Sequence, residues 1–271
     1  MSELWQASRV IFALGVALTL CAHLVFRAWS PLVSNFQGRR VRTGYGVYVA
    51  AWALAPAAVL ALMGGPGFLI VVLGFAVPGF LDDVFGAHGA GGFGGHLKAL
   101  VRQGRVTTGL IKALTGGAAS LAAVMLLDGQ TGARWYNVAA GAAVIALCAN
   151  FINLLDLRPG RAGWVSVALW LAAMAAARAE PLLLLTGPAF LCELALLPAD
   201  SRGRWIMGDS GSNVLGALIG LVIVAGMPPW ARWAALAVLL AVHVFAERRS
   251  ISRTIEAIPA LRWLDSRLGV R

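Results

Sequence analysis

Long apolar stretches separated by short polar segments run through the whole chain. Nine of them stand out, at about 10–26, 46–63, 66–81, 110–127, 136–155, 163–177, 181–198, 212–227 and 230–246. A helix needs roughly 17–25 mainly apolar residues to cross a bilayer, and most of these stretches approach that length. The first lacks the basic start and the cleavage site of a signal peptide, so we expect it to remain as a span. The pattern predicts an all-α polytopic membrane protein with about nine transmembrane helices.

Composition supports the same fold class. Hydrophobic residues make up 59% of the 271 residues, only 13% are charged, and the mean hydropathy is +0.79, which excludes an ordinary soluble domain. A net charge of +10 can indicate nucleic-acid binding, but in a membrane protein basic residues mark cytoplasmic loops, so we expect no nucleic acid. Cys21, Cys148 and Cys192 lie in apolar runs and are interpreted as small buried hydrophobes. We expect one integral membrane domain over residues 1–271.

The basic residues also predict the orientation. Of the 22 Lys and Arg residues, all but Arg9, Arg134, Arg178 and Arg232 fall on one side of the nine predicted spans. Because positive residues favour the cytoplasmic side, the N-terminus is expected outside and the C-terminus in the cytoplasm. In the basic segment at about 247–271, isoleucine and leucine recur every three or four residues. A helix there would be amphipathic and lie along the membrane surface.

Four polar clusters lie where predicted spans meet cytoplasmic loops. They are Asp82 with Asp83; Asn150 with Asn153 and Asp156; Asp209 within 207–212; and Arg248 with Arg249 and Arg253. Ionisable residues at membrane spans are costly and usually functional. Each cluster also has a structural explanation: a solvated helix end for the paired aspartates, hydrogen bonds between helices for the amides, and a helix N-cap for Asp209. Their position at one membrane face favours a common site.

The segment around Asp209 has a further property. Gly208, Ser210, Gly211 and Ser212 are small, and an apolar span follows directly. A helix that begins here has free backbone N–H groups at its first turn, and such a start suits a phosphate or a metal-bound phosphate. The segment therefore indicates an anion site.

In this order, the motifs resemble the polyprenyl-phosphate N-acetylhexosamine-1-phosphate transferases, the glycosyltransferase family 4 type that includes the bacterial phospho-N-acetylmuramoyl-pentapeptide transferase and the undecaprenyl-phosphate GlcNAc-1-phosphate transferases. The resemblance rests on the run RTGYG at 42–46, on Asp82 with Asp83, on a lysine that opens the next span, on 150–156 and on 207–212. It covers most of the chain.

The resemblance implies a reaction and its partners. A sugar-1-phosphate, most simply N-acetylhexosamine-1-phosphate, would pass from a UDP-sugar to a polyprenyl phosphate, with release of UMP. The reaction would need Mg²⁺, for which Mn²⁺ can substitute, and would begin a lipid-linked cell-envelope glycan. The enzyme would be a multi-pass protein of the bacterial plasma membrane with its site facing the cytoplasm. A homodimer is compatible with this family.

The chemistry of such a reaction assigns roles to the clusters. A diphosphate donor and a phosphate acceptor repel each other, so the site must supply cations. Mg²⁺ prefers carboxylate and phosphate oxygens, and we predict Asp209 as its first ligand, with Asp82 or Asp83 beside it. The other member of that pair would orient or deprotonate the acceptor phosphate. Asn153 and Asp156, together with Gly208 and Ser212, would hold the donor or the waters of the metal, and Asn150 is expected to be mainly structural.

Two lysines and three arginines complete the predicted site. Lys112 opens a span, whereas Lys98 lies in the glycine-rich loop at about 82–109, and either lysine could neutralise the diphosphate or reach the membrane interface instead. We prefer Lys112, because its position matches the family. Arg248, Arg249 and Arg253 replace the clustered histidines of the family and can grip a diphosphate in a bidentate manner.

The chain departs from the family pattern after Asp156, where Leu157, Arg158 and Pro159 stand in place of a glycine and a further aspartate. This change puts the identity of the donor sugar in doubt. Two other classes of function are a non-catalytic relative that binds lipid phosphate or a partner enzyme, and a transporter. A non-catalytic relative would be expected to lack Asp82, Asp83 or Asp209. A transporter would be expected to have charged residues near the middle of the membrane and a sequence repeat between its two halves. Neither feature is found in the sequence.

Overall fold

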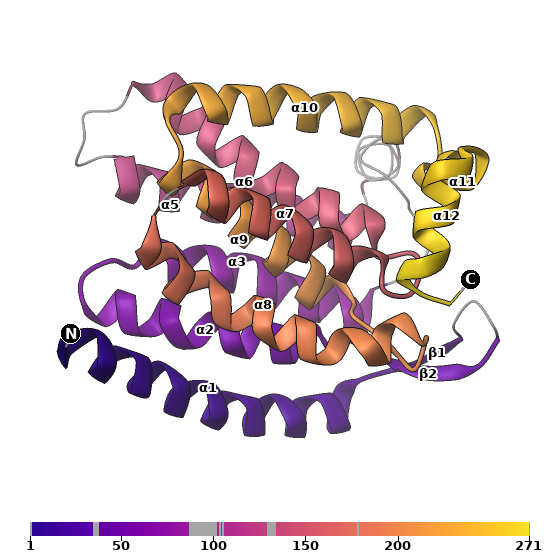
Figure 1. Ribbon diagram of the computed structural model, residues 1–271, viewed down its shortest axis with the longest axis horizontal. Coiled ribbons are helices and arrows are strands. Elements are labelled where there is room, and N and C mark those ends of the chain that lie inside the picture. The colour runs from indigo at the N-terminus through magenta and orange to yellow at the C-terminus, as the bar shows by residue number, and fades with distance from the viewer. Residues whose placement is uncertain are drawn as a thin grey trace.

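The computed structural model describes residues 2–34, 38–86, 102, 104, 106–128, 134–177 and 179–270. Its elements, in chain order, are α1 (Ser2–Trp29), β1 (Leu32–Ser34), β2 (Arg40–Thr43), α2 (Gly46–Leu62), α3 (Gly67–Phe85), α5 (Thr108–Asp128), α6 (Trp135–Leu155), α7 (Arg161–Ala177), α8 (Glu180–Ser201), β3 (Trp205–Ile206), α9 (Asp209–Gly226), α10 (Pro229–Arg248), α11 (Ile251–Ala257) and α12 (Pro259–Leu268). The long helices run side by side, and the two termini lie at opposite ends of the bundle (Figure 1).

Every one of the nine predicted apolar stretches forms a helix. Within the described part of the chain, seven helices are long and apolar enough to cross a membrane, whereas α2 and α7, with 17 residues each, are shorter. This confirms an all-α, multi-pass membrane protein. Two boundaries differ from the prediction: α3 continues to Phe85, so Asp82 and Asp83 lie inside a helix and not in the predicted loop, and α9 already begins at Asp209.

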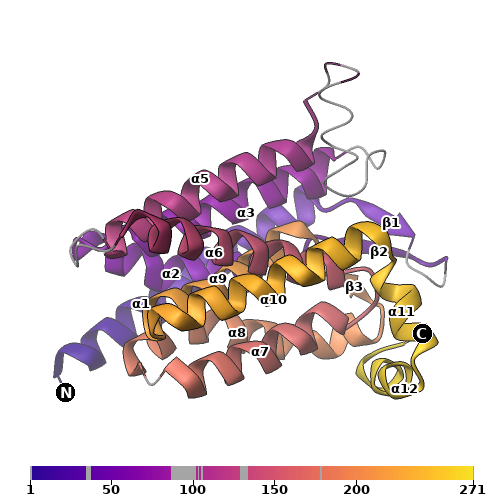
Figure 2. The same ribbon diagram turned by 90° about the horizontal axis from the view of Figure 1, so that it is seen from above.

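Helix α9 forms the centre of the bundle. Nearly all of its residues are buried, and it packs against α2, α3, α6 and α7 (Figure 2). Its small residues allow backbones to approach closely. A Cβ atom at Gly216 would lie 2.6 Å from Ala149 Cα, and one at Gly220 would lie 2.6 Å from Ile145 Cα. The spacing of these two glycines therefore fixes α6 against α9.

The outside of the bundle is apolar. Helices α1 and α10 bury little of their surface, and they expose large side chains such as Trp5, Phe12, Trp230 and Val238. A helix that is apolar on all sides is stable where lipid takes the place of water. The prolines inside α2, α3 and α8 are compatible with this setting, because neighbouring helices can satisfy the freed backbone groups.

A small three-stranded sheet, which the hydropathy pattern did not predict, closes one end of the bundle. Strand β1 pairs antiparallel with β2, and β2 pairs parallel with β3, with Arg42 opposite Leu32 on one side and Trp205 on the other. These strands are only two to four residues long, which is too short for a recognisable alternation. The sheet joins the segment before α2 to the segment before α9.

The basic C-terminal segment forms two helices where one was predicted. The chain leaves helical geometry at Ile258, with φ −94° and ψ 114°, directly before Pro259. Proline disfavours a helical conformation in the residue that precedes it, and this explains the break. We call α11 with α12 the C-terminal hairpin. It lies at the same end of the bundle as the small sheet (Figure 1).

Candidate functional site

The site forms where strand β3 turns into helix α9. Gly208 makes the turn with φ 78°, a conformation that favours glycine, and a Cβ atom there would lie 2.6 Å from Asp83 Oδ1. Helix α3 also approaches through a glycine, because a Cβ atom at Gly79 would lie 2.7 Å from the carbonyl oxygen of Asp209. Two glycines on different elements thus bring the aspartates of α3 to the first turn of α9.

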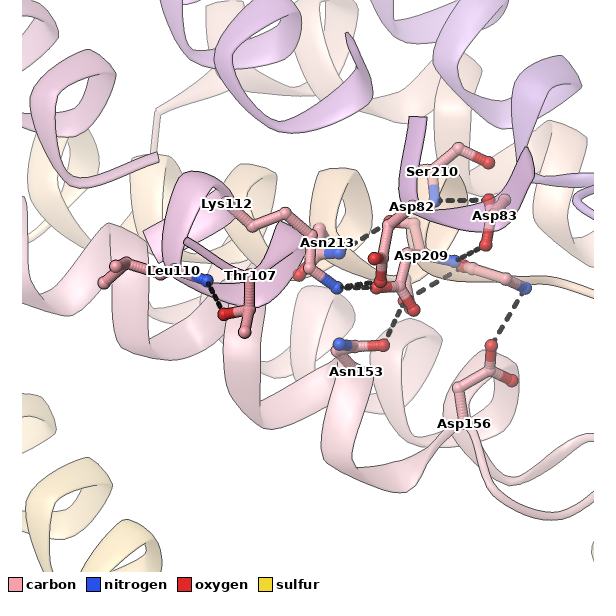
Figure 3. A network of polar contacts seen from close by, with 12 residues as sticks. Asp82, Asp83, Thr107, Leu110, Lys112, Asn153, Asp156, Asp209, Ser210 and Asn213 are labelled. Carbon is pink, nitrogen blue, oxygen red and sulfur yellow. Dashed lines mark hydrogen bonds and ion pairs between the residues drawn. The ribbon is translucent and has the colours of Figure 1, made fainter. Parts of the chain in front are cut away.

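Asp83 and Asp156 bind the backbone at the start of α9. Asp83 Oδ1 accepts the N–H of Asp209 at 2.7 Å, and its Oδ2 accepts the N–H of Ser210 at 3.0 Å. Asp156 Oδ2 accepts the N–H of Gly208 at 2.9 Å (Figure 3). The free N–H groups of a helix N-terminus need such acceptors. Asp83, which lies on α3, therefore caps the N-terminus of α9. From the sequence, this N-cap role was one interpretation of Asp209.

Asp82 and Asp209 face a shared cation, the ammonium group of Lys112. Lys112 Nζ lies 2.5 Å from Asp82 Oδ2 and also forms an ion pair with Asp209 Oδ2 (Figure 3). Each of these three side chains keeps 20–21% of its surface exposed, so the group is open to solvent on one side. Three helices, α3, α5 and α9, each contribute one charged residue to it.

Amide and hydroxyl groups continue the network. The Ser212 hydroxyl lies 3.1 Å from Asn153 Oδ1 and 3.0 Å from the carbonyl oxygen of Gly208, so it can donate to either acceptor. Asn213 Nδ2 donates to the carbonyl oxygen of Asp209 at 2.7 Å. We did not single out Asn213 from the sequence. Its position four residues after Asp209, on the same face of α9, is the signal that could have identified it.

The electrostatics of the site favour additional positive charge. Removal from water raises the pKa of Asp156 well above its usual range, and the charges of Asp200, Asp209 and Asp83 act in the same direction. Several carboxylates close together cannot all be ionised cheaply unless a cation lies among them. Lys112 supplies one positive charge for this group of acids.

The side chains of the site can be compared with the ligands that the predicted Mg²⁺ would need. Among the residues that the structure describes, no group of three or more His, Cys, Asp or Glu side chains is placed to hold a metal ion. The two carboxylates of Asp82 and Asp209 do converge on one cation. Protein sites for Mg²⁺ commonly use one or two carboxylates and complete the shell with water and substrate phosphates. The residues present therefore fit a metal that binds together with its substrate.

The RTGYG run proves to be structural support for the site. Tyr45 is fully buried, and its hydroxyl lies 3.1 Å from Glu193 Oε1 and 3.3 Å from Asp200 Oδ2. Burial, followed by the nearby charges of Glu193 and Asp200, raises the pKa of Tyr45 well above its usual value, so it stays protonated and donates. The backbone of Gly46, the next residue, packs directly on Gly211 of α9.

Other predicted residues lie outside this network. Asn150 is exposed on α6, and Arg248, Arg249 and Arg253 are exposed on α10, α11 and the residues between them. The segment that carries these arginines, from the end of α10 to α11, lies at the same end of the bundle as the small sheet (Figure 1). Lys98 and most of the predicted glycine-rich loop lie outside the described residues. Of the two lysines that competed for the site, Lys112 is therefore the one with observed contacts to its carboxylates.

A small hollow adjoins the network on the side of α1. It is lined mainly by apolar groups, and Asp83 is one of its few polar residues. The lining residues are Phe26, Ser30, Pro31, Thr43, Gly44, Val47, Phe80, Asp83 and Val84. Asp83 thus borders an apolar part of the bundle, and the hollow itself has room for about one water molecule.

Comparison with known proteins gives no family for this chain. A scan against protein-family models found no match, and a search of curated proteins found no significant match.

Proposed function

We propose that this protein transfers a sugar-1-phosphate from a UDP-sugar to a polyprenyl phosphate. The observation that carries the proposal is the arrangement of Asp82, Lys112 and Asp209, in which three helices bring two carboxylates and an ammonium group together at the N-terminus of α9. The first backbone N–H groups at this N-terminus bind Asp83 and Asp156 and are not free for phosphate. The phosphates would therefore be bound by the ammonium group and by a metal ion that the two carboxylates suit. The order of motifs along the chain supports the same reaction.

The chemistry balances with the groups available. An oxygen of the acceptor phosphate attacks the phosphorus that carries the sugar, the bond from this phosphorus to the bridging oxygen of the UDP-sugar breaks, and UMP leaves with that oxygen. The acceptor phosphate is already largely ionised at neutral pH, so no strong base is required. The main task of the protein is to position two anionic substrates and to offset their charge.

Each residue of the network has a part in this task. Asp209 and Asp82 would hold Mg²⁺, which supplies positive charge to the diphosphate when it is bound. Lys112 adds a second positive charge beside these carboxylates. Asp83 and Asp156 hold the backbone at the start of α9 in place and act as positioning residues. Asn153 and Ser212 offer hydrogen-bonding groups to the donor.

The proposal includes a membrane topology. We infer nine spans, including the two shorter helices α2 and α7, with the N-terminus outside and the C-terminus in the cytoplasm. Helices as short as 17 residues can cross a bilayer of ordinary thickness. The separation of the termini at opposite ends of the bundle agrees with an odd number of spans (Figure 1). The site would then face the cytoplasm, where UDP-sugars are made.

We infer that the lipid acceptor approaches the network from the membrane, because the outer surface of the bundle is apolar and suits an isoprenoid chain. Its phosphate would meet the aspartates at the end of the bundle. The donor would approach from the solvent-exposed side of Lys112. This arrangement brings the two phosphates together without either substrate crossing the membrane.

A reconstituted reaction tests the proposal. Purified protein in detergent is mixed with Mg²⁺, a polyprenyl phosphate and one of a set of radiolabelled UDP-N-acetylhexosamines. We expect a labelled lipid and an equal amount of UMP with at least one donor. Absence of product with every donor, from protein that is folded and monodisperse, would contradict the proposal and favour a non-catalytic role in binding lipid phosphate.

A further inference from the structure

The C-terminal hairpin is attached to the bundle through a buried ion pair. Arg161 opens helix α7 and Asp265 lies on α12, and only 2% and 7% of their respective surfaces are exposed. Arg161 Nε lies 2.8 Å from Asp265 Oδ1, and Arg161 Nη2 lies 3.0 Å from Asp265 Oδ2. This is the bidentate geometry in which arginine binds a carboxylate most strongly.

The same guanidinium group also reaches the first helix of the hairpin. Arg161 Nη1 donates to Ser252 Oγ at 2.9 Å, and Ser252 lies directly before Arg253 on α11. One side chain therefore contacts both α11 and α12. Without these contacts, a helix of only seven residues such as α11 has little stability of its own.

Further contacts fix the hairpin at the same place. The N–H of Val270, just after α12, donates to the carbonyl oxygen of Ser201 at 2.8 Å, and Arg158 Nη2 lies 3.1 Å from Glu256 Oε1 on α11. The Arg158 pair is exposed and is expected to contribute little. A Cβ atom at Gly160 would lie 2.5 Å from the carbonyl oxygen of Leu268, so the end of α12 packs closely on the turn before α7.

This turn is part of the candidate site. It runs from Asp156, which accepts the N–H of Gly208, to Arg161, which holds the hairpin. Only four residues separate the two contacts. The hairpin and the start of α9 are therefore attached to the two ends of one short segment.

We propose that Arg161 and Asp265 are positioning residues that hold the C-terminal hairpin against the α6–α7 turn and so present Arg253 and its basic neighbours to a diphosphate donor at the site. The inference rests on the proposed function for its effect on catalysis, and on the contacts above for the attachment itself. A guanidinium group and a carboxylate buried in a bidentate pair define one orientation of the hairpin. Removing one partner leaves the other buried without compensation, which strongly favours release of the hairpin.

The decisive variant is Asp265→Asn, which keeps the size of the side chain and removes its charge. We expect the backbone amides of 259–268 to exchange hydrogen more than about tenfold faster than in the wild type, because the bond to Arg161 is weakened. We expect the KM for the UDP-sugar to rise about tenfold with a much smaller change in kcat, because donor binding and not chemistry loses support. Asp265→Glu keeps the charge and should restore both quantities in part.

The matched control is Glu256→Gln, which removes the exposed partner of Arg158 on the same hairpin. It should leave both hydrogen exchange and KM close to the wild-type values. A purely structural role for the buried pair would lower the melting temperature and the fraction of active enzyme. It would not change KM, which does not depend on the amount of folded enzyme.

The two readouts separate the possible failures. Unchanged exchange of 259–268 in Asp265→Asn would overturn the attachment, whatever the activity of the protein. Faster exchange with an unchanged donor KM would overturn the positioning role. Wild-type protein that lacks turnover would contradict the proposed function and, with it, the role in donor binding, while the exchange measurement would still decide whether the ion pair holds the hairpin.

Discussion

The carboxylate of Asp83 accepts the backbone N–H of Asp209 at 2.7 Å, so the side chain of Asp83 contacts the main chain of Asp209 and leaves the Asp209 carboxylate facing Lys112. Asp82, the neighbour of Asp83, also faces Lys112. Adjacent residues on a helix point about 100° apart, so one member of the pair can orient α9 while the other enters the site. This division leads to different expectations for the two aspartates.

Asp82→Asn and Asp83→Asn should therefore differ in their effects on turnover and on melting temperature. Asp82→Asn removes a charge from the group around Lys112, and turnover should fall roughly 100-fold with little change in melting temperature. Asp83→Asn weakens two hydrogen bonds to the start of α9, and both the melting temperature and turnover should fall. Thermal unfolding in detergent and a turnover assay on the same samples would show this. Equal melting temperatures for the two variants would contradict the capping role of Asp83.

Gly208→Ala tests the close contact between β3, α3 and α9. The added methyl group would lie 2.6 Å from Asp83 Oδ1, on a backbone with φ 78°, and we expect a loss of about 1–3 kcal/mol in unfolding free energy. Gly117→Ala on α5 is the control, because nothing lies within 4 Å of the new methyl group. That change should be neutral or stabilising by roughly 0.5–1 kcal/mol. If Gly117→Ala lowered the unfolding free energy and Gly208→Ala did not, the close contact at Gly208 would be contradicted.

Lys112 and Lys98 can be compared directly. Lys112→Met leaves Asp82 and Asp209 without their shared cation, so turnover should fall roughly 100-fold and the Mg²⁺ dependence should change. Lys98→Met should have a much smaller effect on turnover. Metal titrations of the two variants distinguish them, and a larger loss from Lys98→Met would transfer the charge-neutralising role to the glycine-rich loop.

The exposed arginines after α10 have a separate test. Replacement of both Arg248 and Arg249 by alanine should raise the apparent donor KM several-fold, because each guanidinium group can contribute to diphosphate binding. The effect should shrink at high salt, since exposed charges are screened. An unchanged KM would mean that these arginines serve only to orient the chain in the membrane.

Hydropathy predicted the helices well because nearly every span is apolar on all sides and contrasts with the more polar segments between the spans. It could not show that α3 extends to Phe85 or that α9 begins at Asp209, because polar residues at a membrane end are equally compatible with a loop. The strands β1, β2 and β3 were missed for a related reason. They are held by pairing between distant segments, such as Arg42 with Trp205, and by no local pattern.

Several of the residues singled out from the sequence lie in one network, but the sequence did not show which contacts each of them makes. Which of Asp82 and Asp83 faces Lys112 depends on the rotation of α3, and that rotation is set by packing at Gly79. The contact of Arg161 with Asp265 joins residues 104 positions apart, so spacing along the chain gave no sign of it. Arg161 looked like one more cytoplasmic arginine, because burial cannot be recognised before the hairpin is placed.

In the proposed reaction, Asp209 serves phosphoryl transfer and not the stability of α9. The most direct test is the turnover of Asp209→Asn with Mg²⁺, a polyprenyl phosphate and the preferred UDP-sugar, measured beside its thermal unfolding. We expect turnover to fall roughly 100-fold or more while the melting temperature stays within a few degrees of the wild-type value, because the variant removes a charge directed at metal and phosphate but keeps the backbone N–H that Asp83 accepts. Near-normal turnover by folded Asp209→Asn would contradict the account.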